Sequence, residues 1–393
     1  MIHLFRRRPW VRLQHEELYI PKDYSEAGVD CGAKLENQIA GNPDLHRIHY
    51  ACLHKSPKEF SAWLDAEAPN FAAGTYMFDT DDGNVLDSLR GKHPVLIVNK
   101  RRLDEVRHLN TLLNKTSEVL VDEGYVCFHS RTSALKRRII QEMFPGFLGR
   151  FIASIYYVWH RVFAKLSFTR WLYMRVTNGK NRCYSRVELL GRMYRAGFEV
   201  IDESCCGGEY YILGRKIKDP IWDDEPSCGL LVKLPRVGYK GDIIGVYKFR
   251  TMYSYSEYLQ PYVLEYMGLQ TGGKFANDYR VNSWGRFLRK LWLDEIPMVI
   301  NLLKGQMKLV GVRPLSRQYF NMYSPEMQKL RITVKPGLLP PFYYDAKTPE
   351  SIEDIQESER RYIEAYKAHP FRTDWRYFWG TVGNILFKHK RSN

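Results

Sequence analysis

The chain reads VYKFRTM at residues 246–252, NDYRVNSWGRFLRK at 277–290, WLDEIP at 292–297 and KGQMKLVGVRP at 304–314. In this stretch one acidic pair, Asp294 and Glu295, stands among many Arg and Lys residues. A carboxylate and a phosphate repel each other, so a carboxylate attacks a phosphate only where cations offset both charges. The pattern therefore indicates a site that handles anionic phosphates.

Residues 284–296 are expected to form a helix that Pro297 bends or ends. Helical periodicity would place four charged residues within about 140 degrees of one another: Arg286, Arg289, Lys290 and Asp294. The alternative is an ordinary surface helix with weak ion pairs between its turns. The phosphate site is favoured by further cations in short motifs on both sides: Lys248, Arg250, Lys274, Arg280 and Arg313.

The bulk composition indicates a globular protein that meets an anionic partner. The chain has 393 residues, which is enough for two domains with their own cores. Its net charge of +15 and its 14% aromatic residues suit nucleic acid, anionic lipid or phosphorylated substrates. Seven cysteines lack metal or disulfide spacing, and the basic start lacks an apolar signal core, so we expect the cytoplasmic compartment.

The N-terminal half, residues 1–218, is predicted to be an α/β domain. From Pro94 the chain reads as an apolar strand, a polar periodic helix and a second apolar strand, which is typical of a parallel unit. Residues 185–217 add a helix, a turn at Gly197 and two strands. These segments weakly resemble the second half of a class I methyltransferase-like (Rossmann) domain. The glycine-rich cofactor loop is missing, so we expect a degenerate scaffold without methyl transfer.

Residues 147–166 are predicted to form an amphipathic helix with Phe151, Ile155 and Trp159 on its apolar face and Arg161 and Lys165 opposite. A basic helix with such aromatics can lie in a membrane interface. It can equally be an ordinary helix that packs on the core. No segment reaches the roughly 20 apolar residues of a simple membrane span.

Residues 219–393 are predicted to be a second, helix-rich α+β domain, opening with two strands around a turn at 238–241. Residues 228–337 resemble the bacterial sugar transferase family, the monotopic polyprenyl-phosphate phosphoglycosyl transferases. The resemblance rests on short motifs in matching order: RVG, YKFRTM, D-x-R, GRFLRK, LDE-x-P, NLLKG, LVG-x-RP and VKPG.

That resemblance implies transfer of a sugar-1-phosphate from a UDP-sugar to a membrane polyprenyl phosphate, with release of UMP. Asp294 and Glu295 match the family's catalytic dyad, with Asp294 as the nucleophile that forms a phosphosugar–aspartyl intermediate and as a ligand of Mg²⁺. The implied substrate-binding residues are Lys248, Arg250, Asp278, Arg280, Arg286, Arg289, Lys290, Arg313 and Pro314. An aspartate with an ordinary pKa would need no activating base.

The resemblance also implies partners and a location. The expected partners are a UDP-sugar, polyprenyl (undecaprenyl) phosphate and membrane lipid. No nucleic-acid partner is expected, and a homodimer is possible. The expected place is the cytoplasmic face of the bacterial inner membrane, with monotopic or peripheral attachment, at the first membrane step of surface glycan synthesis.

The chain departs from the family pattern at several points. GVRP and KGQMK stand where GPRP and KGDMS are common, and LLPPFYYD follows VKPG. The family usually has a re-entrant hydrophobic helix before its first strand, whereas this chain has a charged linker there. The helix at 147–166 is the alternative membrane element.

Two other functions fit the composition. A basic, aromatic-rich nucleic-acid-binding protein would show strongly salt-dependent binding, but the acidic pair would weaken its phosphate contacts. An active methyltransferase would bind S-adenosylmethionine, against which the missing glycine loop argues.

Overall fold

The computed structural model describes residues 43–54, 57–67, 70–206, 208–222, 229–259, 262, 278–345 and 351–387. The chain forms two compact units. Unit 1 comprises Met1–Gly229 and Tyr253–Val263, and unit 2 comprises Leu230–Met252 and Leu264–Asn393. The segment that directly follows VYKFRTM thus belongs to unit 1, a crossing that no sequence motif indicated.

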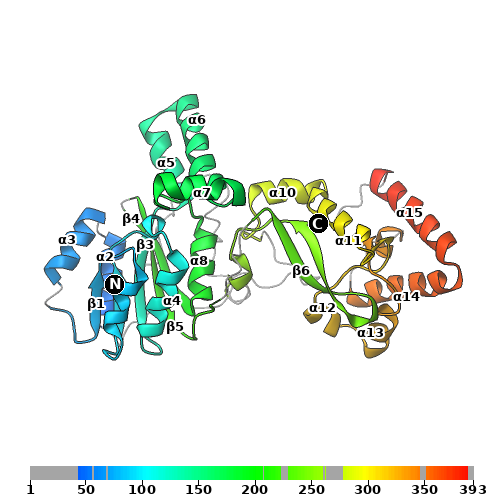
Figure 1. Cartoon of the computed structure of the whole chain (residues 1–393), viewed down its shortest axis with the longest axis horizontal. Helices are drawn as coiled ribbons and strands as arrows, with labels where there is room; N and C mark the ends of the chain where they lie inside the picture. Colours follow the sequence, from blue (N-terminus) through cyan, green and yellow to red (C-terminus); the bar gives the residue numbers. More distant parts are fainter. Residues whose placement is uncertain are drawn as a thin grey trace, which may run out of the picture. The chain divides into compact units, whose positions relative to one another are not determined.

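Unit 1 is built on a five-stranded mixed sheet in the order β1-β2-β3-β5-β4 (Figure 1). Strands β1 to β3 are parallel, and β5 runs antiparallel to both of its neighbours. The strands are Thr75–Phe78 (β1), Leu96–Asn99 (β2), Tyr125–Ser130 (β3), Phe198–Cys206 (β4) and Glu209–Lys216 (β5). The predicted strand–helix–strand unit is confirmed, because helix α4 (Leu109–Val119) connects the parallel strands β2 and β3.

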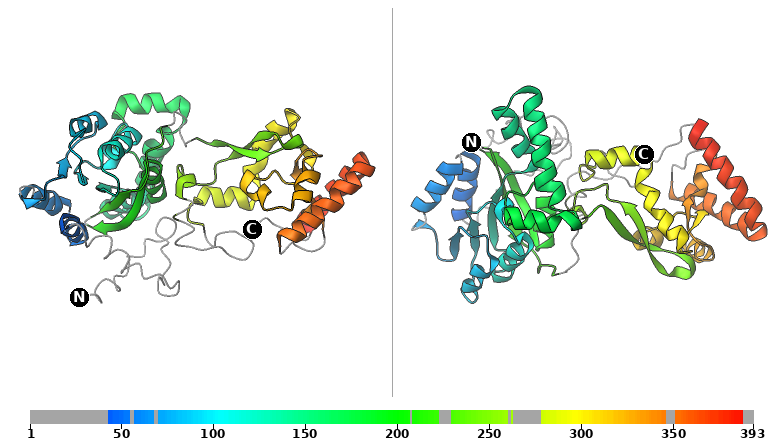
Figure 2. Two further views of the ribbon diagram at one scale, coloured as in Figure 1. Left: turned by 90° about the horizontal axis from the view of Figure 1, so that it is seen from below. Right: turned by 45° about the horizontal axis from the view of Figure 1, so that its top comes forward.

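Helices cover both faces of this sheet, which makes unit 1 a layered α/β structure (Figure 2). On one face α2 (Pro43–His54) and α3 (Pro57–Glu67) bury Leu45 and Leu64 against Leu96 of β2. On the other face lies α8 (Arg186–Arg195), whose Met193 fills the space beside Gly214 of β5. The predicted α/β class is therefore confirmed, whereas the methyltransferase-like resemblance stays a prediction.

The remaining helices of unit 1 include the segment predicted to be amphipathic. That prediction of a helix is confirmed by α6 and the π-helical η5, which ends at Phe163. These helices are α5 (Ser133–Met143), α6 (Gly146–Tyr157), η5 (Val158–Phe163) and α7 (Ser167–Thr177). The short 3-10 turns are η3 (Gly83–Leu89), η4 (Leu103–Glu105) and η7 (Ser256–Leu259).

Unit 2 begins with an antiparallel hairpin of β6 (Leu231–Val237) and β7 (Ile243–Phe249). The predicted turn is confirmed as η6 (Tyr239–Gly241), where Lys240 has a left-handed φ of 57°. A second, parallel pair joins β8 (Lys308–Val310) to β9 (Gly337–Leu339). Ile244 and Val246 of the hairpin bury themselves against Met298 and Met307.

Helices make up most of the rest of unit 2, as predicted. They are α10 (Ser283–Lys290), η8 (Leu293–Met298), α11 (Val299–Leu303), α12 (Arg317–Asn321), α13 (Pro325–Arg331), η9 (Pro341–Tyr343), α14 (Ile352–Ala368) and α15 (Pro370–Phe387). A second core gathers Met327, Tyr362, Ile363 and Tyr377 from α13, α14 and α15. Within the described ranges, no helix combines the length and the apolar character that a bilayer crossing requires.

Candidate active site

The acidic pair lies on a short 3-10 turn rather than on a long helix. Asn282 caps the start of helix α10, because its side chain accepts a hydrogen bond from the Gly285 amide at 2.6 Å, and the helix ends at Lys290. Trp292 then adopts a left-handed conformation with φ of 58° and packs on Tyr343 with ring centroids 5.1 Å apart. The expected continuous helix over 284–296 is therefore wrong, because a tertiary contact accompanies a backbone reversal that helical periodicity cannot show.

The turn presents the two carboxylates in different surroundings. Glu295 accepts a hydrogen bond from the Lys248 ammonium of β7 at 2.6 Å. Asp294 is only 9% exposed. Burial raises the pKa of Asp294, the charges of Lys248 and Arg289 act to lower it, and Glu295 adds to the rise. The expectation of an ordinary pKa for this carboxyl is wrong, since the site withdraws it from water.

Two arginines lie around the acidic turn, and each already has a hydrogen-bond partner. Arg280 is buried and grips Asp278 with both ends of its guanidinium, at 2.8 and 2.7 Å. Arg289 donates from Nε to the Thr251 hydroxyl at 3.0 Å. The charges of Asp294, Asp278 and Arg280 all act on Arg289, so Arg289 is the cation that links the acidic turn to the Asp278–Arg280 pair. Asp278–Arg280 is thus a rigid support, and Arg289 is the guanidinium beside Asp294.

The other predicted cations are spread along the scaffold. Arg286 is exposed on α10 and donates to the Val281 carbonyl at 3.1 Å. Lys290 is exposed at the end of the same helix. Arg250 is half-buried after β7, and its backbone amide donates to Leu230 at 2.7 Å. The charges around Asp294 therefore come from β7 and α10, not from one face of one helix.

Arg313 and Pro314 belong to the opposite end of the hairpin. Arg313 is exposed. Burial and the charge of Arg313 both lower the pKa of Arg236 of β6, which indicates that the two arginines lie near each other. Arg236 pairs with Ile244 and Lys248 pairs with Val232, a separation of four residues or roughly 13 Å along the strand. Arg236 was not among the predicted site residues, although the RVG motif contains it.

Comparison with known proteins identifies this part of the chain. Residues 221–388 match the family described as bacterial sugar transferase. We refer to this matching segment as the sugar transferase domain. This domain includes every site residue described above.

Curated relatives of the sugar transferase domain have related names. The segment is 39% identical over 106 residues to the galactosyl transferase CpsE of Streptococcus agalactiae, covering 26% of this chain and 23% of that protein. It is 30% identical over 158 residues to the undecaprenyl-phosphate galactose phosphotransferase of Salmonella typhimurium, covering 39% and 31%. The UDP-N-acetylgalactosamine-undecaprenyl-phosphate N-acetylgalactosaminephosphotransferase of Aeromonas hydrophila is 36% identical over 107 residues, covering 26% and 22%. The matches thus span less than a third of each of these relatives.

One motif of the sugar transferase domain has a structural task. Asn301, in NLLKG, is fully buried. Its side chain accepts from the Tyr247 amide at 3.0 Å and donates to the Gly245 carbonyl at 2.8 Å. The helix after the acidic turn is thereby fixed to β7, the strand that carries Lys248. Buried side-chain bonds to the backbone of this kind cost free energy when they are broken.

The sugar transferase domain offers a fitting donor set for Mg²⁺. This ion is usually held by one or two carboxylates together with substrate phosphates and water. Asp294 is flanked by Glu295, so the site supplies that minimal carboxylate set. Across the described part of the chain no three His, Cys, Asp or Glu residues gather into an all-protein cage. A magnesium ion here would therefore depend on the substrate for its remaining ligands.

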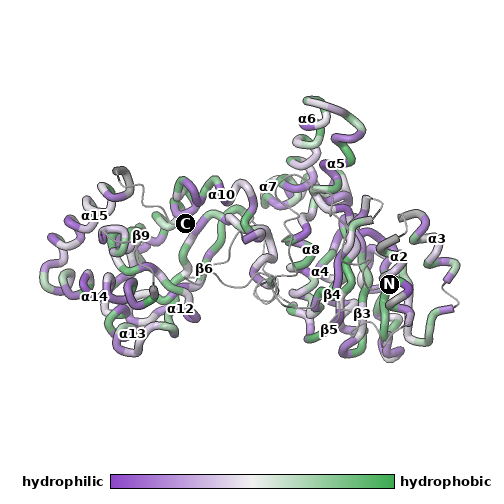
Figure 3. The backbone as a smooth tube through the Cα atoms, turned by 180° about the vertical axis from the view of Figure 1, so that it is seen from behind, coloured by the Kyte–Doolittle hydropathy of each residue, from purple (hydrophilic) through white to green (hydrophobic). Residues whose placement is uncertain are grey.

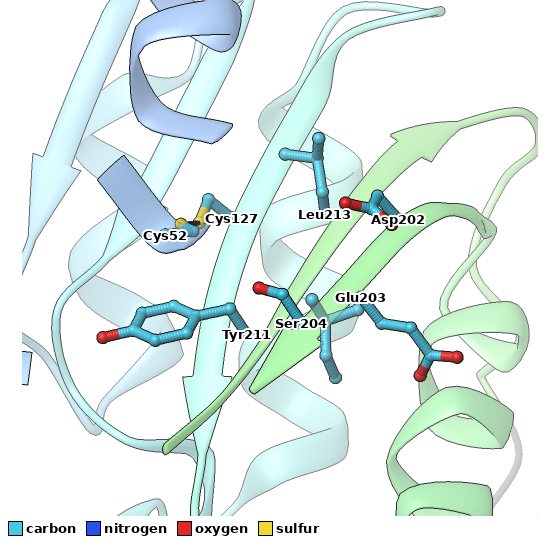
Figure 4. A pocket seen from close by; sticks show the side chains of 8 residues that line it. Cys52, Cys127, Asp202, Glu203, Ser204, Tyr211 and Leu213 are labelled. Atoms are coloured by element: carbon cyan, nitrogen blue, oxygen red, sulfur yellow. Dashed lines mark hydrogen bonds between the residues drawn. The ribbon is translucent and has the colours of Figure 1, made fainter. Parts of the chain in front are cut away.

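Unit 1 holds a cavity between α2 and the sheet, with Cys52, Cys127 and Tyr211 in its lining (Figure 4). The two sulfur atoms are 3.7 Å apart. Its space is about that of one water molecule, so the cavity cannot hold a nucleotide-like cofactor.

Proposed function

We propose that the chain transfers a sugar-1-phosphate from a UDP-sugar to polyprenyl phosphate, with undecaprenyl phosphate as the acceptor, and releases UMP. The names of the Salmonella and Aeromonas relatives support the acceptor, and the Aeromonas name supports the donor. The observation that carries the proposal is a withdrawn carboxylate, Asp294, under the influence of the cations Lys248 and Arg289. The product would start a surface glycan such as an exopolysaccharide, lipopolysaccharide or capsule.

In the first step an oxygen of ionised Asp294 attacks the β-phosphorus of the UDP-sugar. A new bond joins that oxygen to phosphorus, and the bond from phosphorus to the bridging oxygen breaks. UMP departs with the electron pair, leaving the sugar phosphate joined to Asp294 as an acyl phosphate. Lys248 and Arg289 offset the negative charge of the approaching phosphate, which is the dominant requirement of phosphoryl transfer. Mg²⁺ held by Asp294 would neutralise further phosphate charge.

In the second step a phosphate oxygen of the polyprenyl phosphate attacks the same phosphorus. The bond to Asp294 breaks, the carboxylate is restored, and a polyprenyl-diphosphosugar forms. Glu295, held by Lys248, would orient groups around the acceptor. Arg236 and Arg313 are suited to the far end of the donor, since paired guanidinium groups bind phosphate oxygens well.

The test follows UMP from a panel of UDP-sugars with membranes that contain the protein, with and without polyprenyl phosphate. A covalent intermediate predicts one UMP per active site without acceptor and steady release with it. Asp294→Asn should abolish both, because an amide forms no acyl phosphate. Asp242→Asn, at the exposed hairpin turn, is the matched control. UMP release that persists in Asp294→Asn would show that Asp294 is not the nucleophile. Activity that survives a metal chelator would show that the reaction does not require Mg²⁺.

A further inference from the structure

Helices α6 and α7 of unit 1 turn their large apolar side chains outward. Phe147 is 81% exposed, Phe168 is 80% exposed and Trp171 is 66% exposed. Phe151 and Ile155 continue the exposed line along α6. We call Phe147, Phe151, Ile155, Phe168, Trp171 and Val176 the apolar ridge. Phe147 and Phe151 stack one turn apart on α6 with ring centroids 6.2 Å apart, and Phe168 and Trp171 lie one turn apart on α7. Rows of large exposed apolar residues mark an interaction surface.

Each helix is held in unit 1 by its opposite side. On α6 the inward positions are the small residues Gly149 and Ala153. On α7 the inward residue is Tyr173, which is fully buried, receives Trp159 edge-on, and donates from its hydroxyl to the Lys180 carbonyl at 2.8 Å. The apolar ridge is therefore not a core face left incompletely covered, because both helices already have a packed side.

Two charged side chains between α6 and α7, Arg161 and Lys165, point into unit 1. Arg161 is only 8% exposed, and it lies 3.5 Å from Glu188 of α8. Lys165 binds the same carboxylate at 2.6 Å. Burial alone would raise the pKa of Glu188, but Lys165, Arg192 and Arg161 hold it at about 2. This ion cluster anchors the chain between α6 and α7 to α8.

The charge around the apolar ridge has one sign. Residues 143–177 contain Arg150, Arg161, Lys165, Arg170 and Arg175 and no Asp or Glu. Arg150, Arg170 and Arg175 are exposed, and the Arg175 guanidinium lies 5.5 Å from the Trp171 ring centre. A second copy of the chain in a symmetric dimer would bring like charges together at this surface. A partner with an anionic surface and an apolar interior would attract the exposed arginines and would accept the exposed apolar side chains.

We propose that the apolar ridge of α6 and α7 docks unit 1 on an anionic phospholipid bilayer. Trp and Phe enter the interface and the flanking arginines bind lipid phosphates, as in amphipathic interfacial helices. In Figure 1 these helices stand beyond one end of the unit 1 sheet, and in Figure 3 their tubes alternate hydrophobic and hydrophilic colour. This inference needs no transfer chemistry and is tested without substrate.

The experiment measures flotation of the full-length protein with vesicles of phosphatidylglycerol and phosphatidylcholine, and with phosphatidylcholine alone. Phe168→Ser combined with Trp171→Ser should lower partitioning to the anionic vesicles at least tenfold. The matched control is Val85→Ser with Ile217→Ser, two exposed apolar residues elsewhere in unit 1. Equal loss in the control, or unchanged binding in the ridge variant, would overturn the proposal.

Charge reversal separates the lipid surface from a protein partner. Arg170→Glu with Arg175→Glu should weaken anionic-vesicle binding roughly 30-fold at low salt, and added salt should shrink this difference. Lys92→Glu with Lys218→Glu changes net charge equally at exposed sites of unit 1 and should have a smaller effect. A change in oligomeric state at unchanged vesicle binding would make the ridge a protein interface and defeat the proposal.

Discussion

The Lys248 ammonium lies 2.6 Å from a carboxylate oxygen of Glu295. The charge of the same lysine acts to lower the pKa of the adjacent Asp294, which forms no ion pair of its own among the described contacts. One lysine thus serves two acidic residues in different ways. It anchors Glu295 and offsets part of the desolvation of Asp294. This division of roles matches a pair in which one carboxylate reacts and the other positions.

Lys248→Met should reduce UMP release on the order of 100-fold, as expected when one stabilising charge is removed from a transfer site. Because Lys248 lowers the pKa of Asp294, its loss should also move the acidic limb of the activity profile to higher pH. A profile measured for kcat/KM between acidic and neutral pH checks this. Lys233→Met on the exposed side of β6 is the control. An unmoved acidic limb would show that Lys248 does not act on Asp294.

Asp294→Asn should stabilise the fold at neutral pH while abolishing activity. Burial raises the pKa of Asp294 above its unfolded value, so the folded state binds the proton more readily. The carboxylate therefore costs stability at high pH, and this cost disappears as pH falls through the folded pKa to below the unfolded one. Thermal unfolding measured across pH should give the variant a higher Tm than the wild type at neutral pH, and this difference in Tm should vanish under acidic conditions. A lower Tm at neutral pH would contradict it.

Gly285→Ala should destabilise unit 2 by about 1–3 kcal/mol, the usual cost of overpacking. A Cβ at this position would lie 2.0 Å from the Thr251 carbonyl oxygen. The clash would separate α10 from the end of the VYKFRTM motif and disturb the bond between Arg289 and Thr251. Gly383→Ala on α15 meets no atom within 4 Å and should be neutral or stabilising. Equal melting behaviour of the two variants would refute this account.

Arg331→Met should cost about 3–5 kcal/mol, because it leaves the buried carboxylate of Glu359 unpaired. Arg331 also donates to the Arg313 carbonyl at 2.5 Å, so the loop that carries Arg313 loses a support. Arg360→Met breaks a solvent-exposed pair with Glu326 and should change the free energy of unfolding much less, because solvent screens that pair. Denaturant unfolding compares the two, and similar losses would argue against a special role for Arg331.

Much of this protein followed from local pattern. The alternation of apolar and polar residues located the parallel unit β2–α4–β3 and the β6–β7 hairpin, because strand and helix periods are short-range properties. The order of short motifs located the family and the acidic pair. Asn301 shows the limit of motifs, since NLLKG marked the position but not its buried bonds to the β7 backbone.

By itself the sequence determined which segments are amphipathic, charged or turn-forming, because those properties depend on the residues and their nearest neighbours in the chain. Only the tertiary structure decided where those properties face. The packing of Trp292 on Tyr343 accompanies the break between α10 and η8, and Glu188, distant in sequence, draws Arg161 and Lys165 inward. Helical periodicity defines two opposite faces but not which one meets the core, since that depends on partners brought together by folding.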